Sequence, residues 1–91
     1  MFKKLKFMPY AQAQVRILDN GEIALCSYDT MVATISDKGW LYIRGLYSAT
    51  TRKHLKAFCK EYCGFDTFST IRLLAKEQML MNIHTGEIID A

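Results

Sequence analysis

Residues 39–64 constrain the fold more than any other part of this sequence. An alternating segment and a polar hinge lead into a stretch whose apolar residues recur at i, i+3, i+4 and i+7, the spacing of one face of an amphipathic helix. These apolar residues are Leu55, Phe58, Cys59 and Tyr62. Hydroxyl residues precede the stretch and can cap a helix start, and Gly64 follows it and favours a helix stop. The pattern predicts a helix over residues 50–63.

Residues 11–46 read as consecutive strands joined by tight turns. The segments 19–21 and 37–39 each have glycine third, as three-residue hairpin loops require, and we expect a third link of three residues at 28–30. With these loops the strand registers gather the apolar side chains on one face. The predicted core face comprises Val15, Ile17, Ile23, Leu25, Met31, Ala33, Ile35, Leu41 and Ile43. The helix is expected to cover this face.

The remaining segments complete the predicted architecture. Ser69 is expected to cap a short second helix over 70–78, and residues 79–83 and 87–89 read as a C-terminal hairpin. The fold class is therefore α+β, with an antiparallel three- to four-stranded meander packed on one main helix. Residues 1–10, which include Lys3, Lys4 and Lys6, read as a basic arm, and 11–91 as a single domain. The arm is expected to be loosely docked or to contact phosphates.

The predicted outer face of the sheet carries unusual side chains. Trp40 and Tyr42 stand two residues apart, with Arg44 next on the same strand and Arg16 on another. Aromatic side chains beside arginine on an open sheet can stack nucleic-acid bases, or they can anchor a protein partner. A third interpretation is that the C-terminal segment covers them.

Two polar sets accompany the predicted helix. The first is a basic face that can contact phosphates or can be an ordinary solvated face; it comprises Arg52, Lys53, Lys56 and Lys60. The second lies at the helix start and can serve as a cap or as a site for a phosphate or carboxylate; it comprises Ser48, Thr50, Thr51 and His54.

Composition narrows the function classes. The chain has 91 residues, a net charge of +3 and three cysteines without CxxC spacing, which indicates reduced thiols in a cytoplasmic protein. No signal peptide or membrane span is expected. No catalytic triad, phosphate-binding glycine loop or zinc spacing is present, so we expect a protein that is not an enzyme and has no metal or cofactor.

The stretches LCSYDTMVATI and GLYSATTRKHLKAF carry a resemblance over residues 22–64. They are similar to a family of short uncharacterised proteins of phages, plasmids and other mobile elements, with a pattern like L-x-SY-x-T-x-VA-x-I and G-x-YS-x-TT-x-x-HI-x-x-F. This sequence departs from the pattern at Leu55, where isoleucine is usual. The resemblance implies an accessory protein working in a bacterial cytoplasm and supplies no activity.

Three functions follow as hypotheses. The first is nucleic-acid binding through the outer sheet face and the basic helix. The second is a stoichiometric, anti-CRISPR-like inhibitor that binds a host defence protein through the Trp40 and Tyr42 face. The third is a structural or self-associating phage protein, such as a homodimer that buries this face.

Overall fold

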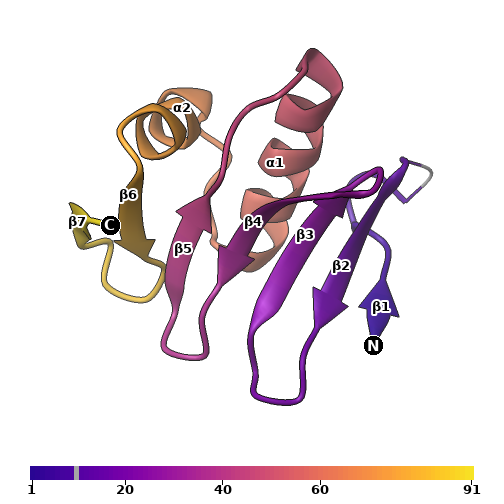
Figure 1. The fold of residues 1–91 in the computed structure, drawn as a ribbon, viewed down its shortest axis with the longest axis horizontal. Coiled ribbons are helices and arrows are strands. Elements are labelled where there is room, and N and C mark those ends of the chain that lie inside the picture. Colours follow the sequence, from indigo (N-terminus) through magenta and orange to yellow (C-terminus); the bar gives the residue numbers. More distant parts are fainter. Residues whose placement is uncertain (10) are drawn as a thin grey trace.

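The computed structural model describes residues 1–9 and 11–91 as one antiparallel sheet with two helices on one face (Figure 1). The seven strands lie in sequence order: β1 Phe2–Lys3, β2 Ala13–Ile17, β3 Ile23–Ser27, β4 Thr30–Ile35, β5 Trp40–Ile43, β6 Met79–Asn82 and β7 Ile88–Asp90. The helices are α1, Ala49–Tyr62, and α2, Phe68–Lys76. The α+β class is confirmed, and the sheet is larger than the predicted three or four strands, because β1 and the C-terminal hairpin extend it at both edges.

Two of the predicted hairpins have the expected three-residue loops. Leu18 N donates to Glu22 O across the first loop, and Ser36 N donates to Trp40 O across the other. Gly21 and Gly39 have φ of 90° and 91°, a conformation that favours glycine. The registers that follow from these loops, β2 with β3 and β4 with β5, match the prediction.

The link between β3 and β4 differs from the prediction. Ser27 pairs with Thr30, so the loop has two residues rather than three, and the register shifts next to Leu25. The extra residue on β4 is Val32, which is fully buried, whereas Met31 is only partly buried. The predicted core position of Met31 was therefore wrong, and Val32 points into the core instead, because a β-bulge reverses the alternation locally.

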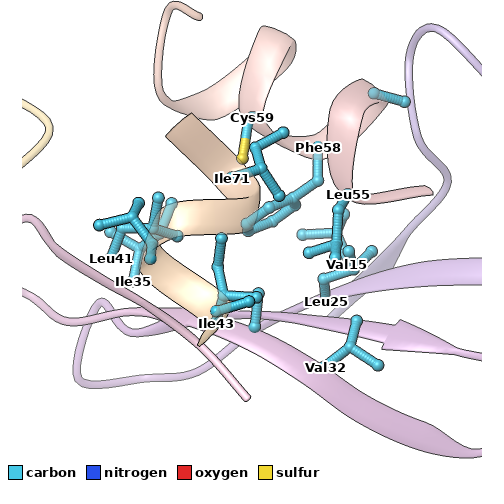
Figure 2. Packing of buried hydrophobic residues seen from close by; sticks show 14 of the residues in the cluster. Val15, Leu25, Val32, Ile35, Leu41, Ile43, Leu55, Phe58, Cys59 and Ile71 are labelled. Carbon is cyan, nitrogen blue, oxygen red and sulfur yellow. The ribbon is translucent and has the colours of Figure 1, made fainter. Parts of the chain in front are cut away.

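Helix α1 closes the core over β3 and β4. It begins and ends one residue before the predicted bounds, and Leu55, Phe58 and Cys59 are fully buried as expected. Figure 2 shows these three side chains pointing into the cluster formed with the sheet. Because α1 and α2 pack on the same face, the other face of the sheet carries no helix in the described part of the chain (Figure 1).

Helix α2 buries Ile71, Leu74 and Ala75, the side predicted from the sequence. The expected cap was wrong: the helix begins at Phe68 after Thr67, so Ser69 lies inside it. Neither helix, over the described residues, has the length and apolar composition needed to cross a lipid bilayer.

The N-terminal residues contact the rest of the domain. Lys3 pairs with Val15 in the sheet, Leu5 is fully buried in the core, and Lys6 N donates to Glu61 Oε1 at 2.7 Å. The described part of the expected arm therefore packs on the sheet edge and on the end of α1. Its last residue, Tyr10, lies outside the described residues.

Candidate nucleic-acid interface

The predicted binding residues fall on two opposite sides of the molecule. The cations of α1 are exposed, while its buried residues face the sheet. Trp40 and Tyr42 lie on the helix-free face, because they alternate with buried Leu41 and Ile43. The molecule measures 20 Å along its shortest axis, the axis on which Figure 1 is viewed. One extended strand of nucleic acid cannot lie along both surfaces at once, so the two sets are separate candidates.

The exposed side of α1 carries an ordered row of positive charge. Arg52, Lys56 and Lys60 follow each other at intervals of four residues, which places neighbours about 6 Å apart along the helix axis. Lys53 lies beside this row, and all four side chains are exposed. A row of cations at this spacing can neutralise successive phosphates of one strand.

The N-terminal residues continue this row at the end of α1. Lys60 Nζ lies 4.5 Å and Lys6 Nζ lies 5.5 Å from the centre of the Phe7 ring, which is 43% exposed. Two ammonium groups therefore lie close to one exposed aromatic ring, which brings the charge of the N-terminal segment next to the α1 row. Sequence reasoning missed this contact, because no local pattern relates Phe7 to a residue more than fifty positions away.

Helix α2 continues the row at the other end. Arg52 Cζ lies 5.7 Å from the centre of the Phe68 ring, and Arg72 and Lys76 are exposed on α2. Sequence reasoning left these α2 residues out, although Phe68, Arg72 and Lys76 share an i, i+4, i+8 spacing that places them on one side of a helix.

The charge is distributed unevenly along the fold. Residues 1–9 carry three lysines and no carboxylate, and residues 49–78 carry six lysines and arginines against three carboxylates. The remaining residues, mostly strands and turns, have more carboxylates than cations. We define the α1 row with Lys6, Phe7, Arg72 and Lys76 as the basic surface.

The helix-free sheet face has a different character. A hollow of about 320 Å³ on this face is lined by Glu22, Thr34, Ser36, Trp40, Tyr42 and Leu80. Its lining includes one carboxylate and no cation.

Tyr42 OH donates to Gln78 Oε1, and the C-terminal strand β6 lies beside β5 instead of covering Trp40. The two arginines expected here lie outside the hollow lining: Arg16 is 5.8 Å from the Phe2 ring centre at the sheet edge, and Arg44 is exposed after β5.

The polar residues at the start of α1 form a network within the protein. Ser48 Oγ accepts from Thr51 N at 3.2 Å, and Ser48 Oγ and Thr51 Oγ1 are also 3.2 Å apart. His54 Nδ1 lies 2.7 Å from Ser27 Oγ, and the His54 side chain is 1% exposed. Burial lowers the pKa of His54, so its ring is neutral at neutral pH. The network ties α1 to the end of β3, and Thr50 is exposed beside it.

The cysteine thiols are free in the described structure. The hydrogen bond to Cys63 and burial both raise the pKa of Cys59, which keeps this thiol protonated and indicates a packing role. Over residues 1–9 and 11–91, no group of three or more histidine, cysteine or carboxylate side chains is placed to hold a metal ion.

The fold defines a small α+β domain whose excess of positive charge lies in the helical layer and the N-terminal segment. A family model described as a family of unknown function, DUF8033, matches residues 4–74, and the chain belongs to this family. The match extends beyond residues 22–64 and includes the N-terminal segment and most of α2. No curated protein and no solved structure matches the chain significantly.

Proposed function

We propose that this protein binds nucleic acid, and that the basic surface makes the phosphate contacts. The observation that supports the proposal best is the contact of Lys6 and Lys60 with one exposed ring, which joins the N-terminal lysines to the α1 row. Such a concentration of positive charge favours the binding of a polyanion, because neutralising its phosphates releases condensed counterions. The resemblance to proteins of mobile elements adds an expected setting, a phage or plasmid accessory protein in a bacterial cytoplasm.

The proposal predicts steep salt dependence. If the four α1 cations contact phosphates, the logarithm of the association constant falls with the logarithm of salt concentration with a slope of about −3 for a single strand. Fluorescence anisotropy with labelled single-stranded and duplex oligonucleotides, between about 50 and 200 mM salt, measures this slope. If neither oligonucleotide binds at the low salt limit, the proposed function is wrong.

A protein partner for the sheet face is the second candidate. The hollow beside Trp40 and Tyr42 is poor in cations, and aromatic side chains in such positions anchor protein interfaces. The partner is then a host defence protein or a second copy of the chain.

The second candidate predicts that Trp40→Glu abolishes the association. Light scattering gives the mass of the wild-type protein and the variant, alone and mixed with a nuclease-treated host extract. A dimer mass that Trp40→Glu reduces to the monomer supports self-association, whereas a larger complex formed only with extract supports a host partner. Equal monomer masses under all conditions would contradict both, and circular dichroism checks that the variant is folded.

A further inference from the structure

A hollow of about 240 Å³ lies between the start of α1 and α2. Its lining contains three cationic side chains, one aromatic ring and one aliphatic side chain, and no carboxylate. The lining residues are Leu46, Arg52, Phe68, Arg72 and Lys76. Cations that converge on a concave surface repel one another, so an anion that enters the hollow relieves this repulsion.

The three cations reach the hollow from two helices. Phe68, Arg72 and Lys76 form one row along α2, and Arg52 reaches this row from the first turn of α1. The Arg52 guanidinium lies over the Phe68 ring, with 5.7 Å from Cζ to the ring centre. Packing on a ring restricts the guanidinium and leaves its N–H groups available for planar, bidentate contacts with an oxyanion.

We propose that this hollow binds a phosphate monoester. A monoester carries a charge between −1.5 and −2 near neutral pH and presents three acceptor oxygens, which matches three convergent cations better than a singly charged diester. An adjoining hollow of about 420 Å³ shares Phe68, Arg72 and Lys76 with the first and adds Ser69, Leu73 and Glu77. The Leu73 side chain is 45% exposed and can contact the sugar or the base attached to the phosphate.

Two sources supply this chemistry, the terminal phosphate of a nucleic-acid strand and a free mononucleotide. The strand terminus is favoured, because Arg52 belongs both to the hollow and to the α1 row along which the strand is proposed to lie. For that source the inference rests on the proposed function, whereas binding of a free mononucleotide does not depend on it.

The experiment compares ligands that differ only in the monoester. The probes are a short single-stranded oligonucleotide with and without a terminal phosphate, and AMP with adenosine as its phosphate-free partner. The proteins are the wild type, Arg72→Gln in the hollow, and Lys53→Gln, an exposed cation of α1 that does not line the hollow. Fluorescence anisotropy measures the binding of the oligonucleotides, and calorimetry measures the binding of AMP and adenosine.

The wild type is expected to bind the phosphorylated oligonucleotide about tenfold more tightly than its partner, because charged hydrogen bonds to the extra phosphate are gained. Arg72→Gln is expected to remove this preference. Lys53→Gln is expected to weaken the binding of both oligonucleotides by the same factor and so to keep the preference. AMP binding that adenosine does not share, and that Arg72→Gln abolishes, supports the free nucleotide source.

If neither the terminal phosphate nor AMP gives an advantage that depends on Arg72, the phosphate site is wrong. If neither oligonucleotide binds but AMP does so through Arg72, the proposed nucleic-acid function fails and the phosphate site stands. Oligonucleotide binding without any monoester preference has the opposite meaning: the function stands and the phosphate site fails.

Discussion

Replacing Phe58 with alanine is expected to lower the free energy of unfolding by about 3–5 kcal/mol, the usual cost of truncating a buried aromatic side chain. Phe58 is fully buried at the contact between α1 and the sheet (Figure 2). Its ring centre lies 5.2 Å from that of Tyr62. Alanine favours the helix, so the loss comes from packing and the cavity left behind. A domain of this size has a total stability of roughly 5–15 kcal/mol, so the variant would lose a large fraction of it.

Urea denaturation followed by circular dichroism measures this loss. Leu73→Ala is the matched control, because it truncates a large apolar side chain on α2 that is 45% exposed, and it should change stability by less than about 0.5 kcal/mol. A Phe58→Ala variant as stable as the Leu73→Ala control would mean that α1 does not close the core as described.

The parts of the fold that the sequence predicts are those set by local pattern. Two glycine-containing loops determine the pairing of four strands, since a slip by one residue would turn Ile35 and Leu41 out of the core. The α1 stripe follows from helical spacing in the same way. The loop length and the local register between β3 and β4 could not be predicted in this way. Met31 and Val32 are both apolar, so either can be buried without disturbing the pattern.

Contacts between distant segments could not be predicted. Trp40 on β5 pairs with Asn82 on β6, although both helices lie between these strands in the sequence. Because of this pairing, β6 lies beside β5 and does not cover the Trp40 face. Lys6 meets Glu61 through a backbone N–H group, which has no sequence signature. The candidate site changes accordingly: the cations predicted on α1 gain neighbours at both ends, and the aromatic residues predicted with them lie on the other side of the sheet.

Charge reversal on α1 tests whether the basic surface makes the phosphate contacts. Lys56→Glu is expected to weaken oligonucleotide binding about tenfold, because it removes one of the proposed phosphate contacts and adds repulsion, and to reduce the salt slope by roughly 0.7. Adding Lys60→Glu should bring the loss to on the order of a hundredfold, since the proposal assigns the two side chains to different phosphates. Both side chains are exposed, so the fold should persist.

The control is Lys38→Glu in the turn between β4 and β5, an exposed lysine outside the basic surface. It changes the net charge by the same amount as Lys56→Glu, so it measures how far the total charge alone affects binding. We expect it to change affinity less than threefold, because exposed charges more than about 10 Å from a phosphate are largely screened. Equal losses for Lys38→Glu and Lys56→Glu would show that the protein attracts nucleic acid through its net charge and has no defined interface on α1.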